Sequence, residues 1–107
     1  DDVLLELAIA GAKGWVAGYP NALPAASAEL YHAAVDGELA TAKKLYEQLH
    51  PLLRWDSKVE FVQAIKLSMD LVGRHGGPVR PPRVPLLPEQ ESAVRTATEN
   101  AVAAGLA

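Results

Sequence analysis

The stretch from Gly11 to Pro24 constrains the fold of this chain more than any other part of it. It reads Gly-Ala-Lys-Gly-Trp-Val-Ala-Gly-Tyr-Pro-Asn-Ala-Leu-Pro, so that glycines bracket a short β-prone run at 15–17. Glycines let a backbone pass close to other groups, and proline at a first helical position presets the helical φ. A strand over 15–17, a turn and then a helix form the βα unit of α/β enzymes. One strand cannot make a sheet. Either the other strands lie outside these 107 residues, or the run has another role.

The remainder of the chain is typical of helices, because its apolar residues are mostly Ala, Leu and Val at helical spacing. Asp1 and Asp2 predict a cap for a first helix that is apolar nearly all round, so we expect both of its sides to be buried. A capping box at 57–60 predicts the start of the fourth helix, and Pro51 should end or kink the third. The predicted helices cover residues 3–10, 24–36, 38–50, 58–72 and 88–104.

Helical spacing also predicts which side chains face the core. They are Ala26, Leu30, Ala33 or Ala34, Leu39, Ala42, Leu45 or Tyr46, Leu49, Phe61, Val62, Ile65, Met69, Val72, Val94, Ala97, Ala101 and Val102. Between the last two helices, residues 73–88 hold three Gly and five Pro and can be neither helix nor central strand. We interpret this proline-rich segment as a stiff connection across the core, in preference to a PxxP ligand of an SH3-type groove.

Composition excludes several classes of function. The formal charge of −3 argues against a nucleic-acid partner, which would need a cationic face. No apolar run approaches the length of a membrane span, and we expect no membrane partner. The chain has no cysteine, which fits a cytoplasmic protein, and its three histidines show no metal-ligand spacing. We therefore expect no metal site.

Taken in order, several short motifs resemble the C-terminal part of the dihydrodipicolinate synthase / N-acetylneuraminate lyase family. The pair at 1–2 resembles the acidic residues after the family's seventh strand, and residues 11–18 resemble its eighth strand. Asn21 and Pro24 match its turn into the eighth helix. The family's C-terminal domain is matched by residues 33–38, 64–66 and 79–82.

The resemblance implies the fold class. Family members are α/β proteins, (β/α)8 TIM barrels followed by a three-helix C-terminal extension. Residues 1–37 would then be the end of the barrel (helix 7, strand 8 and helix 8), and residues 38–107 the C-terminal helical domain. This chain by itself would be mostly α-helical.

The resemblance also implies an activity for a parent protein. The family joins pyruvate or a related 2-oxo acid to a lysine on the sixth strand as a Schiff base, and a tyrosine on the fifth strand assists. Both strands would precede Asp1, so the fragment lacks the catalytic lysine and should be inactive alone. No cofactor is implied, because the protonated imine is itself the electron sink. The implied partners are the 2-oxo acid, the remainder of the barrel and, since the family is usually oligomeric, further copies of the chain.

One active-site contribution carries over to this chain, the main-chain carbonyl of Val16, which the family places near the reacting group. Gly18, Tyr19 and Asn21 follow at the end of the strand where such barrels keep their chemistry, and are candidates for the substrate pocket. Lys66 and Arg80 are assigned structural roles. Lys66 should lay its stem over the core, and Arg80 should pin the proline-rich segment by binding carbonyls or a carboxylate.

A second hypothesis needs no barrel. The chain would be a self-contained helical interaction module without catalytic activity, and residues 14–18 would be a buried connector. A module should unfold cooperatively as a soluble species, whereas the end of a barrel should expose the first helix and the 15–17 run.

Overall fold

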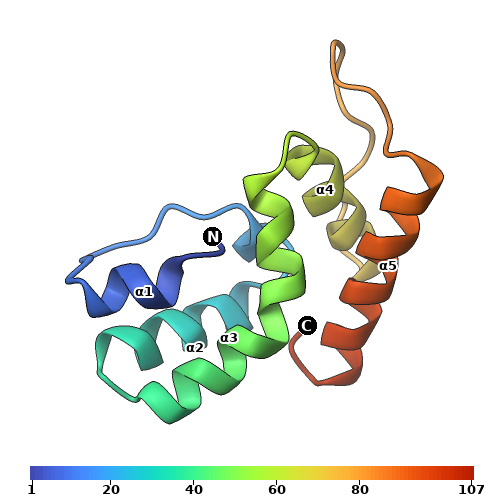
Figure 1. Cartoon of the computed structure of the whole chain (residues 1–107). Coiled ribbons are helices and arrows are strands. Elements are labelled where there is room, and N and C mark those ends of the chain that lie inside the picture. The colour runs from blue at the N-terminus through green and yellow to red at the C-terminus, as the bar shows by residue number, and fades with distance from the viewer.

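The computed structural model describes all 107 residues and contains five α-helices and two short 3₁₀ helices (Figure 1). Their bounds are α1 Leu4–Ile9, η1 Tyr19–Asn21, α2 Pro24–Val35, α3 Leu39–Leu53, η2 Arg54–Ser57, α4 Phe61–Leu71 and α5 Pro88–Ala103. None of the helices combines the length and the apolar character that crossing a membrane requires.

All five predicted helices are present, with two notable differences at their ends. α3 continues through Pro51 to Leu53, because Leu49, Leu52 and Leu53 are each only 1% exposed and anchor both sides of the proline in the core. α4 begins at Phe61, later than predicted, and the capping box does not form. Ser57 lies in η2, and its hydroxyl donates to the Asp2 carboxylate, so it is not available as a cap.

The predicted strand is absent from this structure. Residues 12–17 are an extended segment without regular secondary structure, and Val16 is fully exposed. A strand needs a neighbour with which to exchange main-chain hydrogen bonds, and no other part of the chain supplies one. The segment is held by side chains instead, because the Tyr31 hydroxyl donates to the Lys13 carbonyl at 2.9 Å and the Trp15 indole donates to Asp1. It is not the buried connector that the helical-module hypothesis expects.

α1 is buried on one side only, contrary to expectation. Leu4 faces the core, whereas Val3, Leu7 and Ile9 are 48%, 52% and 65% exposed. α1 packs on α2 and α3 and lies on the opposite side of the molecule from α5 (Figure 1). Asp1 does not cap α1, whose N-cap residue makes no side-chain hydrogen bond.

One core joins all the elements. The predicted stripe of α2 is buried, as are Ala42, Leu45, Tyr46 and Leu49 of α3, whereas Leu39 and Val102 are exposed. The buried members from both halves of the chain form one cluster of 20 residues: Leu4, Tyr19, Ala22, Leu23, Ala26, Leu30, Ala33, Ala34, Ala42, Leu45, Tyr46, Leu49, Leu52, Leu53, Trp55, Ala64, Ile65, Val94, Ala101 and Leu106. Residues 1–37 and 38–107 therefore share a core.

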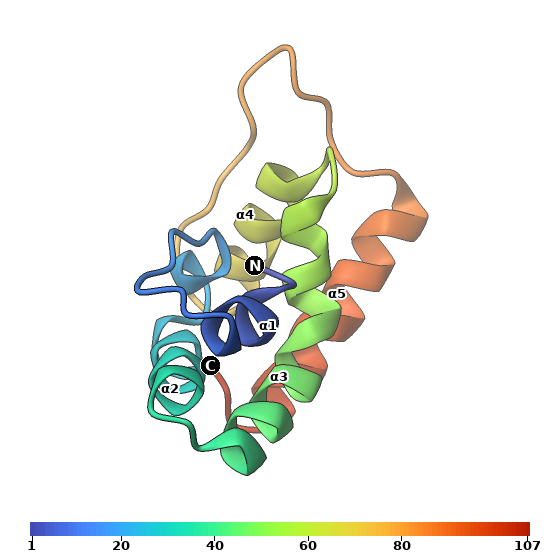
Figure 2. The ribbon, with the colours of Figure 1, turned by 60° about the vertical axis from the view of Figure 1, so that its left-hand side comes forward.

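The proline-rich segment (residues 73–88, of which Pro88 begins α5) runs back along α4, and its middle part projects beyond the helices as the tip of the molecule (Figures 1 and 2). Side chains of α4 hold it, because Gln63 Nε2 donates to the Val84 carbonyl at 2.9 Å and Lys66 Nζ donates to the Pro78 carbonyl at 2.8 Å. At Gly76 the segment lies directly on the α4 backbone. A Cβ there would lie 2.2 Å from the Lys66 carbonyl oxygen, which leaves room only for glycine.

Candidate active site

The Asp1 carboxylate organises the corner that the sequence singled out. It accepts hydrogen bonds from the main-chain N–H of Gly18 at 3.2 Å and of Tyr19 at 3.0 Å, and from the Trp15 indole at 3.2 Å. One carboxylate thus fixes the extended segment on both sides of Val16. Charge-assisted bonds of this kind are stronger than neutral ones, so the main-chain carbonyls of the segment have a defined position.

Gly18 is needed at this corner because η2 and α4 come close to it. A Cβ on Gly18 would lie 2.3 Å from Asp56 Oδ1 and 2.6 Å from Ile65 Cδ1. The C-terminal helices thus reach the end of the extended segment directly. Asp56 brings a second carboxylate to the corner beside Asp1, and its Oδ2 lies 3.5 Å from the amino nitrogen of Asp1.

The other predicted site residues, Val16, Tyr19 and Asn21, differ in how exposed they are and in what they contact. The side chain of Val16 points into solvent, and its assignment concerns only the main-chain carbonyl. Tyr19 is 1% exposed, so its ring is a core residue, and its hydroxyl lies 3.5 Å from Ser68 Oγ. The Asn21 side chain is exposed and turns back to donate to the Gly18 carbonyl at 2.8 Å, where it stabilises the turn.

Asp2 forms a second anchor, between the start of the chain and η2. Its carboxylate accepts hydrogen bonds from the Ser57 hydroxyl and from Arg54 Nη1, the latter at 2.9 Å. The Ser57 hydrogen bond and the Arg54 guanidinium favour the charged carboxylate, and together they hold the pKa of Asp2 below its ordinary value. The Asp2 side chain is 10% exposed, whereas that of Arg54 is 60% exposed, so the ion pair is open to water on the arginine side.

Tyr46 of α3 also contacts the region around Asp2. Its hydroxyl lies 2.8 Å from Glu6 Oε2 and also contacts the Asp2 main-chain carbonyl. Burial, together with hydrogen bonding to Glu6, raises the pKa of Tyr46 above its ordinary value, so the hydroxyl remains a donor. These contacts are structural, because they tie α1 to α3 beside the Asp2 anchor.

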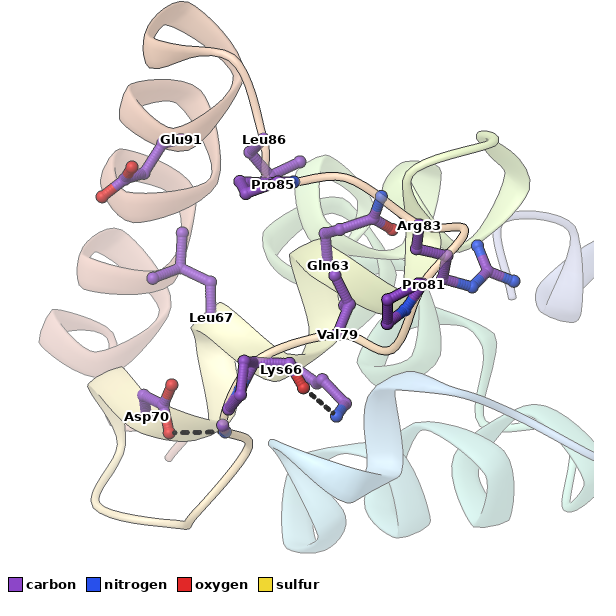
Figure 3. Close-up of a pocket in the computed structure, with 12 residues that line it drawn as sticks. Gln63, Lys66, Leu67, Asp70, Val79, Pro81, Arg83, Pro85, Leu86 and Glu91 are labelled. Atoms are coloured by element: carbon purple, nitrogen blue, oxygen red, sulfur yellow. Dashed lines mark hydrogen bonds between the residues drawn. The ribbon is translucent and has the colours of Figure 1, made fainter.

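A hollow lies between α4, α5 and the proline-rich segment, with a volume of about 390 Å³ (Figure 3). Most of its polar groups already have partners, the exception being the buried Gln63 Oε1. Lys66 binds the Pro78 carbonyl, and Asp70 Oδ1 accepts the main-chain N–H of Gly76 at 2.8 Å and of Gly77 at 3.3 Å. These N–H groups lower the pKa of Asp70. The groups that line the hollow hold the segment in place, and none is arranged as an acid–base pair.

Arg80 does not make the contact expected of it. It is exposed, and its guanidinium has no hydrogen-bond partner in the chain. Arg83 performs that task, because it donates to the Val59 carbonyl at 3.3 Å and lies over the Phe61 ring at 5.0 Å.

Three acids at the corner, Asp1, Asp2 and Asp56, have roles that the sequence did not predict. Asp1 and Asp2 were expected to cap α1, and no role was predicted for Asp56. The partners of Asp1 and Asp2 lie 14 to 55 residues away, so no local pattern identifies them. No cluster of His, Asp or Glu side chains is arranged to hold a metal ion.

The chain is similar to known proteins over most of its length. A sequence model described as the dihydrodipicolinate synthetase family matches residues 1–101. The 4-hydroxy-tetrahydrodipicolinate synthase of Methanothrix thermoacetophila is 32% identical over 95 residues, which cover 89% of this chain and 32% of that protein. The enzyme of the same name from Thermomicrobium roseum is 35% identical over 92 residues, covering 82% of this chain and 29% of the relative.

A solved structure agrees with these relatives. The crystal structure of a protein assigned as a dihydrodipicolinate synthetase from Pseudomonas aeruginosa superposes with a TM-score of 0.81 and 32% identity. The match covers 92% of this chain and 34% of that one. The chain thus spans about a third of the length of the proteins it matches.

Proposed function

Since this chain belongs to the dihydrodipicolinate synthetase family, we propose that it is the C-terminal part of a Schiff-base lyase acting on pyruvate or a related 2-oxo acid. In this proposal α1, the extended segment 12–17 and α2 are helix 7, strand 8 and helix 8 of a (β/α)8 barrel. The helices α3, α4 and α5 are the C-terminal extension. The parent protein is a cytoplasmic homo-oligomer that needs no metal or organic cofactor.

The exposed edge of α1 and the extended segment is the observation that carries the proposal. Leu7, Ile9 and Val16 are more than half exposed. The elements that carry them, α1 and the extended segment, lie on the side of the molecule away from α5 (Figure 1). An apolar groove of about 270 Å³ runs between α1 and residues 12–16. Apolar residues gathered at one edge mark a surface that packs against further protein. The rest of a barrel would cover this edge and would supply strands to pair with residues 12–17.

In this proposal the chain contributes a hydrogen-bond acceptor to the active site, together with the residues that hold this acceptor in place. The main-chain carbonyl of Val16 faces the reacting group, Gly18 and the main chain of Tyr19 and Asn21 adjoin it, and Asp1 holds the segment in place. A carbonyl whose position is fixed before substrate arrives costs no reorganisation during the reaction.

None of the five lysines of the chain forms the imine in this proposal. The imine is made elsewhere in the barrel, where the ketone of the 2-oxo acid condenses with a lysine amine and releases water. The 107-residue chain alone is therefore inactive.

Reductive trapping tests the proposal. Borohydride reduces a lysine–pyruvate imine to a stable secondary amine, which mass spectrometry locates. We expect an adduct in the parent protein, on a lysine outside this chain, and none on the isolated chain. An adduct on one of the five lysines of this chain, or none in the parent protein, would overturn the proposal.

A dye-binding measurement separates the proposal from the helical module. The isolated chain should bind a hydrophobic dye through the edge formed by α1 and the extended segment. Replacing Leu7 and Ile9 by Gln should reduce the binding, whereas the same change at Val84, which is 68% exposed at the tip, should not. A dye-negative monomer would favour the module.

A further inference from the structure

Three buried hydroxyls connect the proposed active-site corner to the C-terminal helices. Tyr19 of η1 is 1% exposed, and Ser68 of α4 and Thr98 of α5 are both fully buried. Tyr19 Oη lies 3.5 Å from Ser68 Oγ, and Ser68 Oγ lies 2.8 Å from Thr98 Oγ1. Ser68 is the only hydrogen-bond partner of the Tyr19 hydroxyl. Buried polar groups are costly without partners, so these three depend on one another.

The donor and acceptor roles of the three hydroxyls follow from Thr98, the last of them. Thr98 Oγ1 lies 2.8 Å from the Val94 main-chain oxygen, which can only accept, so the Thr98 proton is used there. Thr98 must then accept from Ser68, and Ser68 must accept from Tyr19, because each hydroxyl has one proton to donate. Burial raises the pKa of Tyr19 to about 12, which keeps its proton in place.

Tyr19 is therefore held at two points. Its main-chain N–H donates to Asp1 at the corner, and its hydroxyl reaches α4 and, through Ser68, α5. Its carbonyl accepts the N–H of Ala22 and of Leu23, so a shift of Tyr19 would move the whole turn. Tyr19 follows Gly18 directly, and the same shift would reach the Val16 carbonyl.

We propose that Ser68 and Thr98 are positioning residues, which set the place of the active-site corner from within the C-terminal helices. The inference rests on the proposed function in one respect, namely that the corner belongs to an active site. Apolar side chains would fill the same space with no hydrogen bonds to satisfy. A chain of hydroxyls specifies one arrangement, because each member must align with the next. The C-terminal helices would then govern the geometry of the corner through these buried hydroxyls.

Matched substitutions at Thr98 separate the hydroxyl from the packing. Thr98→Val keeps the shape and removes the hydroxyl, whereas Thr98→Ser keeps the hydroxyl and removes a methyl group. Amide hydrogen exchange in the 107-residue chain gives the readout at Ala22 and Leu23, with Leu30 in the middle of α2 as the internal reference. We expect Thr98→Val to speed exchange at Ala22 and Leu23 by about two- to tenfold relative to Leu30, as for loss of one hydrogen bond. Thr98→Ser should leave that ratio unchanged.

Repeating the Thr98 substitution in a Tyr19→Phe chain tests whether its effect passes through the Tyr19 hydroxyl. In a Tyr19→Phe chain the hydroxyl is already absent, so Thr98→Val should no longer change the exchange ratio. An equal effect of the two Thr98 variants, or an effect that persists in the Tyr19→Phe background, would overturn the inference.

The parent enzyme supplies the catalytic readout. There we expect Thr98→Val to lower kcat with little change in KM, and Thr98→Ser to restore it. An unchanged kcat in an enzyme that forms the pyruvate adduct would overturn the positioning role. If no adduct forms while the exchange result holds, the proposed function fails and the coupling of the corner to α5 stands.

Discussion

Replacing Gly76 by Ala should detach the proline-rich segment from α4. The new Cβ would lie 2.2 Å from the Lys66 carbonyl oxygen, 2.7 Å from its Cα and 2.8 Å from its carbonyl carbon. All three atoms belong to the backbone of a helix, which cannot yield without losing its own hydrogen bonds. The segment must therefore move away, and the contacts of Pro78 with Lys66 and of Gly76 with Asp70 must lengthen.

The cost can be bounded from known cases of overpacking. Forcing one extra carbon into a filled site typically destabilises a protein by about 1–3 kcal/mol. For a domain of about this size each kcal/mol lowers the melting temperature by roughly 4–8 °C. We therefore expect Gly76→Ala to melt at least about 4 °C below the parent chain.

Thermal unfolding followed by circular dichroism measures this loss, and Gly14→Ala is the control. Gly14 has nothing within 4 Å of the position of a Cβ, and its φ is not in the left-handed region. Alanine there should be neutral or stabilise by about 0.4–1 kcal/mol, because it restricts the unfolded chain. Exchange of the Gly77 amide, which donates to Asp70, adds a local readout and should become faster only in Gly76→Ala.

Two results would refute this reasoning. If Gly76→Ala melted with the parent chain, the segment would not lie on α4 as closely as the structure places it. If Gly14→Ala destabilised as much as Gly76→Ala, the loss would reflect glycine itself and not the contact with Lys66.

Two other predictions concern the core and the Asp2 anchor. Leu49→Ala should lower the free energy of unfolding by about 2–5 kcal/mol, whereas Leu39→Ala, at a residue 51% exposed, should cost much less; equal losses in urea titrations would contradict the described core. The pKa of Asp2 is lowered on folding, so the stability that it contributes is present above the ordinary carboxyl pKa of 3.8 and is lost as pH falls through the lower, folded value. Asp2→Asn should flatten that part of the pH–stability curve, and Arg54→Met should flatten it only in part, because the Ser57 hydrogen bond, the largest single cause of the shift, remains. An unchanged curve in Asp2→Asn would contradict the anchor.

The helices that could be predicted from the sequence are those with a local signal. The i, i+4, i+7 spacing of α2 and the Leu87–Pro88 start of α5 are complete within a few residues, and both helices appear where they were expected. Pro51 shows the limit of such rules. A proline should break a helix, yet tertiary burial of Leu52 and Leu53 keeps α3 intact.

The candidate site could be predicted only in part. The order of short motifs was enough to identify the family, and the match over residues 1–101 confirms it. The roles of Asp1 and Asp2 could not be found, because a carboxylate before a helix is ordinarily a cap and its true partners are distant in sequence. Residues 15–17 of the extended segment were predicted as a strand from their composition, but strand structure also depends on a neighbour that composition does not report.

The single core shared by residues 1–37 and 38–107 has a consequence for a chain cut at Gly37. Gly37 lies in an exposed turn between α2 and α3, with a φ of 76°. Each piece would carry an incomplete set of core side chains, since Leu23 and Leu30 pack in the same cluster as Leu49 and Val94. Neither piece would be a folding unit, yet the two together hold every contact of the intact chain. Separately prepared fragments should therefore recognise and complement each other in solution, as two halves of one hydrophobic interior.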